Sequence, residues 1–185
     1  AQDFSAQLAR IQASSKTPDF IYVSSYMPDL GMIIRTIREA GMKTPIVGGD
    51  TYDDPGLFEA VGPDYGNEVY FVTHGFLSPA SNPRVADFIE SYKKKYGKDP
   101  EALWIMPGYD VVYVLKKAME KAGTTDGAAV AKAMEEMDFD NLTGHIHWSD
   151  AASGHMPTKA AAMVMLQNGK PQFIGWITPA TLPPK

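Results

Sequence analysis

The chain has 185 residues, of which 44% are hydrophobic and 21% are charged, a composition typical of an ordinary globular protein. Its formal net charge of −5 argues against a general nucleic-acid-binding protein, which needs basic clusters to hold phosphates. The absence of cysteine excludes disulfides, thiolate catalysis and cysteine-based zinc or iron–sulfur sites. The sequence starts without a methionine or a signal-peptide pattern, so we expect a mature protein or a piece of a longer one.

Residues 19–50 predict a strand, a helix and a second strand. Apolar runs at 20–23 and 44–47 predict the two strands, and a helix with one buried face is predicted between them. The residues that recur at the helical spacing i, i+3, i+4 and i+7 are Leu30, Ile33, Ile34 and Ile37. A crossover of this kind makes the two strands parallel. The loops after both strands therefore meet at one edge of the sheet, where open α/β sheets bind ligands.

Tyr26 and Asp50 are the candidate ligand-binding residues at this edge. Asp50 follows two glycines, and its carboxylate suits a ligand ammonium group; the alternative is a turn aspartate that caps backbone amides. A third alternative makes Asp50, Asp53 and Asp54 oxygen ligands of Ca²⁺ or Mg²⁺, although their spacing lacks the alternation of an EF-hand loop. Tyr26 either contacts a ligand with its ring and hydroxyl or covers the edge of the sheet.

After residue 50 the predicted secondary structure changes twice, first from alternating helices and strands to helices alone, and then to strands. We expect Asp54 and Pro55 to begin a helix and residues 68–73 to form a third strand. Helices without intervening strands follow the polar connection at 77–83, and Pro107 predicts a late start or a kink in the second of them. Residues 146–148 predict a short strand. Two strand-like runs flank Asn168-Gly169, which is a strong hairpin signal.

No catalytic signature is present in the sequence: it contains no G-x-S-x-G, P-loop, G-x-G-x-x-G or H-E-x-x-H motif. His145 and His147 fall on one face of a predicted strand and suit two imidazole ligands, with His155 or Asp150 as a third ligand of a metal ion. A chance pair of histidines is the alternative. We therefore predict no enzyme, no cofactor and no metal site, with a metal-dependent hydrolase as the least favoured function.

Four stretches in order resemble the C-terminal half of a type I periplasmic binding protein of the Leu/Ile/Val-binding family, the solute receptors of ABC importers. They are DFSAQLARIQASSKTPDFIYVSSYMPDLGMIIRTIREAGMKTPIVGGD, FVTHGFLSP, NPRVADFIESYKKKYGKDPEALWIMPGYDVVYVL and TGHIHWSDAASGHMPTKAAAMVMLQNGKPQFI. The resemblance implies an α/β fold with one parallel-sheet lobe, helices of the other lobe and a C-terminal β-hairpin. Residues 1–76 would form the second lobe, 77–143 would be helices of the first lobe, and 144–185 would return to the second.

The resemblance also implies the site residues. Tyr26 in SSYMPDLG matches the ligand-contacting tyrosine of the family, with Ser25 beside it, and Asp50 in GGDT matches the acidic residue that pairs with the ligand ammonium. Family members often have Glu there, so the shorter Asp implies a different reach. Trp104 falls close to an aromatic position that faces the ligand, although core packing is its alternative role. The lobe that holds the ligand carboxylate would be absent, leaving half of a site.

The implied partners are an amino-acid-like ligand and an ABC permease in the membrane, and no nucleic acid. The implied location is periplasmic, or extracellular with a lipid anchor. A ligand-sensing domain of a signalling receptor has the same fold and is the alternative function. Helices that cover a missing sheet need another partner, so we also expect dimerisation, domain swapping or altered packing through Phe88, Ile89, Tyr92 and Val112.

Overall fold

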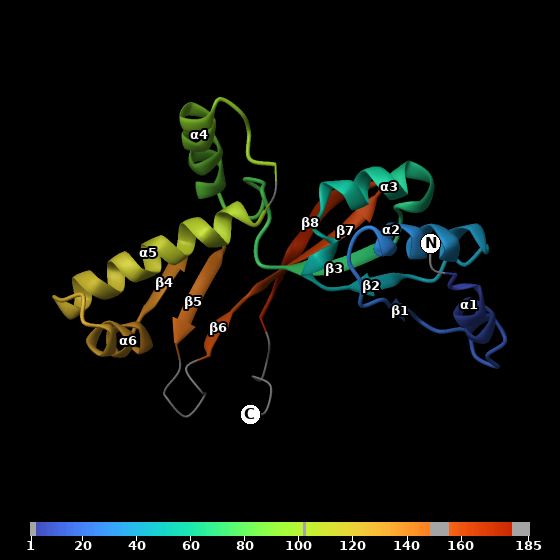
Figure 1. Cartoon of the computed structure of the whole chain (residues 1–185), viewed down its shortest axis with the longest axis horizontal. Coiled ribbons are helices and arrows are strands. Elements are labelled where there is room, and N and C mark those ends of the chain that lie inside the picture. The colour runs from blue at the N-terminus through green and yellow to red at the C-terminus, as the bar shows by residue number, and fades with distance from the viewer. Residues whose placement is uncertain (1–2, 102, 149–155, 179–185) are drawn as a thin grey trace. The chain divides into compact units, whose positions relative to one another are not determined.

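The computed structural model describes residues 3–101, 103–148 and 156–178 (Figure 1). The chain divides into two compact units, and each is considered by itself. Unit 1 contains Ala1–Thr73 and Met163–Ile174, and unit 2 contains His74–Ala162 and Gly175–Lys185. No helix among the described residues is both long and apolar enough to cross a membrane.

Unit 1 is built on a sheet with the strand order β1-β2-β3-β7-β8. The elements that precede unit 2 are α1 (Ser5–Gln12), β1 (Ile21–Tyr22), α2 (Asp29–Glu39), β2 (Ile46–Gly48), the 3₁₀ turn η1 (Asp50–Tyr52), α3 (Pro55–Tyr65) and β3 (Val69–Thr73). Strands β1, β2 and β3 pair in parallel, with Ile21 opposite Ile46 and Ile46 opposite Val69. The predicted strand–helix–strand unit is therefore confirmed.

The local sequence accounts for these elements. Leu30, Ile34 and Ile37 are buried on one side of α2, as their spacing predicts. Asp54 caps α3 by accepting a hydrogen bond from the backbone N–H of Gly56 at 2.7 Å, and Pro55 occupies the first helical position, so the predicted helix start is also confirmed. Strand β1 is an edge strand, which explains why Tyr22 is 61% exposed.

The predicted hairpin consists of β7 (Ala161–Gln167) and β8 (Lys170–Ile177). Its two loop residues, Asn168 and Gly169, have φ angles of 52° and 72°, which a two-residue hairpin turn with the twist of the strands requires. Alternate residues of β7 are fully buried: Ala162, Val164 and Leu166. The hairpin prediction is therefore correct in position and in turn chemistry.

The described part of unit 2 contains three helices and a small antiparallel sheet. The helices are α4 (Arg84–Tyr96), α5 (Ile105–Ala122) and α6 (Gly127–Glu135), and the sheet has the order β4 (Asp138–Asn141), β5 (Gly144–Trp148) and β6 (Pro157–Lys159). Helix α5 begins late, with Pro107 in its first turn, as predicted. Strand β5 contains the predicted run at 146–148, whereas β4 and β6 were not predicted.

Many apolar side chains of α5 do not lie on the side of the helix that is buried. Its buried side is spaced at i+4 and consists of Met106, Asp110, Val114 and Ala118. Four apolar residues on its other sides are exposed by 37–64%: Val111, Val112, Leu115 and Met119. Val112 therefore lacks an apolar cover, as expected. Phe88, in contrast, is covered within the chain: it is only 8% exposed and packs with Val85, Leu103, Met106 and Leu142. The expectation that Phe88 needs an outside partner is therefore wrong.

Candidate functional site

The carboxyl ends of β1 and β2 place the predicted ligand residues of unit 1 at one edge of the sheet. Ser25 and Tyr26 follow β1, and Asp50 opens the turn η1 directly after β2. Because the two strands are parallel and adjacent, their following loops leave from the same edge. Tyr26 is 73% exposed, so its ring is available for contact. The edge therefore presents a hydroxyl-bearing aromatic ring and a carboxylate.

Two neighbouring side chains of η1 tie these two loops together. Thr51 Oγ1 donates a hydrogen bond to the Ser25 carbonyl at 2.7 Å, and Tyr52 donates its hydroxyl to the Val23 carbonyl at 2.8 Å. Tyr52 is completely buried, and burial raises the pKa of its hydroxyl above the usual range, so this group remains a donor. The spacing between the loop of Tyr26 and the turn of Asp50 is therefore fixed by side-chain contacts and by strand pairing.

Gly48 makes room for Tyr52. A Cβ atom at position 48 would lie 2.1 Å from the Tyr52 ring, which leaves no space for any other residue. From the sequence, the two glycines before Asp50 marked only its place after a strand, and the roles of Thr51 and Tyr52 were not predicted. A glycine within a β-strand was the available signal, because it often marks a close approach of another group.

Replacing Tyr52 by phenylalanine is expected to lower the free energy of unfolding by about 1 kcal/mol, because the ring stays buried while one hydrogen bond to Val23 is lost. Urea denaturation measures the change. Tyr65→Phe is the control, since no hydrogen bond of the Tyr65 hydroxyl is found among the described residues. Equal stabilities of the two variants would contradict the role of the Tyr52 hydroxyl.

Asp53 and Thr73 form a buried polar pair at the same edge, after β2 and at the end of β3. Asp53 Oδ2 and Thr73 Oγ1 are both buried, and neither has a hydrogen bond of good geometry among the described residues. Burial raises the pKa of the Asp53 carboxyl to about 6; the Thr73 hydroxyl opposes this rise and Asp54 adds to it. This carboxyl is therefore costly to ionise in the folded chain.

The geometry argues against the alternative that Asp50, Asp53 and Asp54 bind a divalent cation. Asp54 is engaged as the cap of α3, and Asp53 Oδ2 is buried. Within residues 3–101, 103–148 and 156–178, no group of three histidine or acidic side chains is arranged to hold a metal ion.

The two histidines of β5 are engaged by aspartates of β4. His145 contacts Asp140 at 2.8 Å through Nδ1 and Asp138 at 2.9 Å through Nε2, and His147 Nδ1 lies 3.2 Å from Asp138. The hydrogen bond to Asp140 raises the pKa of His145, and Asp138 adds to the rise. Their predicted common face is confirmed. The proposed third metal ligands, His155 and Asp150, lie outside the described residues.

Trp104 belongs to unit 2, where it immediately precedes α5. Its side chain is 48% exposed, and its ring meets that of His74 edge-on at 5.6 Å between centroids. It is therefore not a core residue, and its exposed part remains open to contact.

Parallel strands β1, β2 and β3 with polar and aromatic side chains after their carboxyl ends define an α/β protein of the class that binds ligands at this edge. The chain belongs to the periplasmic binding protein family, whose model matches residues 1–171. Its architecture is that of the type I members of this family.

Three relatives illustrate the similarity. The structure of a leucine binding protein LivK from Thermotoga maritima is 35% identical, with a TM-score of 0.78 over 97% of this chain and 49% of the other. The Leu/Ile/Val-binding protein homolog 7 of Brucella abortus is 30% identical over 134 residues, 70% of this chain and 34% of its own. The leucine-, isoleucine-, valine-, threonine-, and alanine-binding protein of Pseudomonas aeruginosa is 24% identical over 80% of this chain and 38% of its own.

The chain thus spans at most about half the length of these relatives. The match accounts for the sheet, the helices and the hairpin together, because it extends over both units. The dimerisation expected from the sequence finds no support in these relatives.

Proposed function

We propose that this chain supplies one wall of a binding site for an amino acid or a related small solute that carries an amine. The observation that carries the proposal is the fixed edge at which Tyr26 and Asp50 follow adjacent parallel strands. In this proposal the Asp50 carboxylate pairs with the ligand ammonium, a charge-assisted contact that contributes about 1.5–3 kcal/mol. Ser25, Tyr26 and, from unit 2, Trp104 supply contact surface.

In the same proposal, the longer protein to which this chain belongs is the extracytoplasmic binding component of an ABC importer, in the periplasm or at the outer cell surface. That protein delivers its solute to a membrane permease. In this proposal unit 1 belongs to one lobe, and unit 2, which contains the helices α4, α5 and α6, belongs to the other. The exposed stripe of α5 then packs on a sheet that lies outside this chain, which explains an apolar helix face without a cover.

The names of the relatives support solute binding for transport over the two alternative functions, a ligand-sensing domain of a signalling receptor and a metal-dependent hydrolase. One is named a leucine binding protein, one a Leu/Ile/Val-binding protein homolog and one a leucine-, isoleucine-, valine-, threonine-, and alanine-binding protein; none of the three is named as a signalling receptor or a hydrolase. Closure of two lobes on the solute would be the change that the permease recognises.

Calorimetry tests the half-site part of the proposal. Titration of the 185-residue chain with the common amino acids is expected to give weak binding or none, because one carboxylate contact leaves the ligand carboxylate without a partner. Micromolar affinity in this chain would contradict it.

The role of Asp50 is tested in the longer protein, in which both walls are present. Asp50→Asn is expected to lower the affinity for the preferred amino acid at least about tenfold, which corresponds to 1.4 kcal/mol. Asp64→Asn, an exposed carboxylate on α3, is the control and should leave the affinity unchanged. Equal affinity of the Asp50 variant and the unmodified protein would remove Asp50 from the site.

A further inference from the structure

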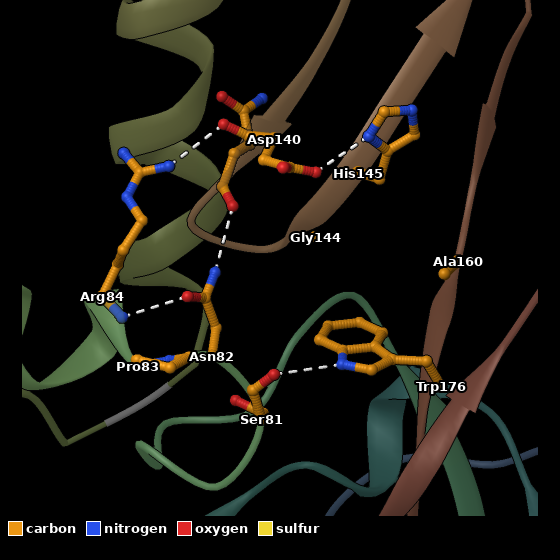
Figure 2. A pocket seen from close by; sticks show the side chains of 10 residues that line it. Ser81, Asn82, Pro83, Arg84, Asp140, Gly144, His145, Ala160 and Trp176 are labelled. Atoms are coloured by element: carbon orange, nitrogen blue, oxygen red, sulfur yellow. Dashed lines mark hydrogen bonds and ion pairs between the residues drawn. The ribbon is translucent and has the colours of Figure 1, made fainter.

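Unit 2 contains a pocket of about 420 Å³ where the start of α4 meets the turn between β4 and β5 (Figure 2). None of its lining residues belongs to the candidate edge of unit 1. Figure 2 shows Arg84, Asp140 and His145 toward the upper end of the view and the Trp176 indole below them. The pocket thus combines a charged end with an aromatic end.

The walls of this pocket are fixed by hydrogen bonds. Asn82 donates through Nδ2 to the carbonyls of Asn141 at 3.2 Å and Leu142 at 3.0 Å, and its Oδ1 accepts from the Arg84 backbone N–H at 3.0 Å. One side chain thereby joins the first turn of α4 to the β4–β5 turn. A pocket whose walls are held in this way loses little conformational entropy when it binds a ligand.

The aromatic end is equally constrained. Trp176 donates from Nε1 to the Ser81 carbonyl at 3.0 Å, which fixes the orientation of the indole. Gly144 has a φ of 107°, and a Cβ atom there would lie 3.4 Å from the six-membered part of the indole. Glycine thus allows the turn and keeps the ring face close to the backbone, so an apolar surface faces the pocket.

Arg84 supplies the donors of the charged end. Its Nη1 donates to the Asp140 carbonyl at 3.0 Å, and no carboxylate pairs with its guanidinium among the described residues. The carboxylate of Asp140 is engaged by His145, which lies 2.8 Å away. The Arg84 guanidinium is therefore the group at this end of the pocket that still has hydrogen-bond donors to offer. Its planar pair of N–H groups matches the two oxygens of a carboxylate.

We propose that this pocket is a second ligand site, which binds a small organic carboxylate with an apolar or aromatic body. The carboxylate accepts hydrogen bonds from Arg84, and the body lies against Trp176. This site is separate from the amino-acid wall proposed above, because it requires neither Tyr26 nor Asp50. Small-molecule sites generally combine an apolar lining with a few oriented polar groups, as this pocket does.

Three probes with the same body and different headgroups test the proposal: 3-phenylpropionate, its neutral amide and 3-phenylpropylamine. Each is titrated into the ¹⁵N-labelled 185-residue chain, and the indole N–H signal of Trp176 is followed after assignment with Trp176→Phe. The acid is expected to shift this signal while the Trp104 indole stays unchanged. Arg84→Gln should weaken binding of the acid about tenfold, and Arg10→Gln, which removes an exposed arginine of unit 1 that does not line the pocket, should not change it.

The test does not depend on a single variant. Ala160→Leu fills the pocket without altering Arg84 and should also abolish the shift, while thermal unfolding checks that both variants are folded. Equal binding of the acid and the amide would overturn the proposed carboxylate recognition. Preferred binding of the amine would assign the charged end to Asp140 instead. The proposal would also fall if the acid produced no shift of the Trp176 signal at its highest soluble concentration.

Discussion

Replacing Asp110 by alanine is expected to lower the free energy of unfolding by about 3–4 kcal/mol, because three buried hydrogen-bond donors would lose their common acceptor at once. Asp110 is only 6% exposed on the inner side of α5. Its carboxylate accepts hydrogen bonds from the backbone N–H of Leu142 at 3.0 Å and of Thr143 at 2.8 Å, and from the Thr143 hydroxyl. Alanine would leave these donors buried without an acceptor.

The same carboxylate acts on Lys159. The Lys159 ammonium donates to the carbonyls of His74 at 2.7 Å and Thr143 at 2.6 Å. Burial lowers the pKa of Lys159 to about 8, and the charge of Asp110 opposes this effect. Since the folded chain binds this proton less tightly than the unfolded chain, the contribution of Lys159 to stability rises with pH from about 8 toward 10.5. Without Asp110 the pKa of Lys159 should fall further.

Urea denaturation followed by tryptophan fluorescence measures the effect of Asp110→Ala. Glu90→Ala is the matched control, since it removes an exposed carboxylate from the neighbouring helix α4 and should change the stability by less than about 0.5 kcal/mol. Asp110→Asn should fall between the two, because an amide oxygen still accepts hydrogen bonds without the charge. A loss of less than 1 kcal/mol in Asp110→Ala would show that water or relaxation replaces the carboxylate.

The parts of the fold that the sequence predicted depend on neighbours along the chain. The helix α2 is visible in the spacing of Leu30, Ile34 and Ile37, the cap of α3 in Asp54-Pro55, and the β7–β8 hairpin in Asn168-Gly169. Each signal is local, because helix periodicity, capping and turn geometry involve residues within a few positions of one another. The common edge of Tyr26 and Asp50 followed from one further rule, the parallel pairing across a crossover.

The parts that were missed depend on partners distant in sequence. Asp110 stands among apolar residues of α5, and its partners lie more than thirty residues away on the β4–β5 turn. The Tyr52 hydroxyl donates a hydrogen bond to the Val23 carbonyl, and no periodic pattern in the sequence relates these two residues. Strand β4 contains two aspartates with exposed side chains, so apolar alternation could not reveal it. Buried polar contacts of this kind are set by tertiary structure, which a single sequence does not display.

Replacing Asp53 by asparagine is expected to change the stability in the opposite direction, so that the variant is more stable than the natural chain. Its carboxyl has a pKa of about 6 in the folded chain against an ordinary value of 3.8. The folded state therefore binds this proton more tightly than the unfolded state. Asp53 costs no stability below pH 3.8, and the cost grows as the pH rises toward 6 and stays constant above it. The difference in pKa sets an upper limit of about 3 kcal/mol.

Asp53→Asn should accordingly raise the free energy of unfolding by about 1–3 kcal/mol at pH 7.5 and change it little at pH 4. An amide has no ionisation to suppress, and its N–H group can donate to Thr73 Oγ1, which otherwise has no hydrogen bond of good geometry among the described residues. Asp64→Asn removes an exposed carboxylate of the same unit and should be neutral at both pH values. A gain that is equal at pH 4 and pH 7.5 would attribute the effect to packing. The gain expected here, confined to higher pH, would show that the edge carrying Asp50 retains a carboxylate at a cost in stability.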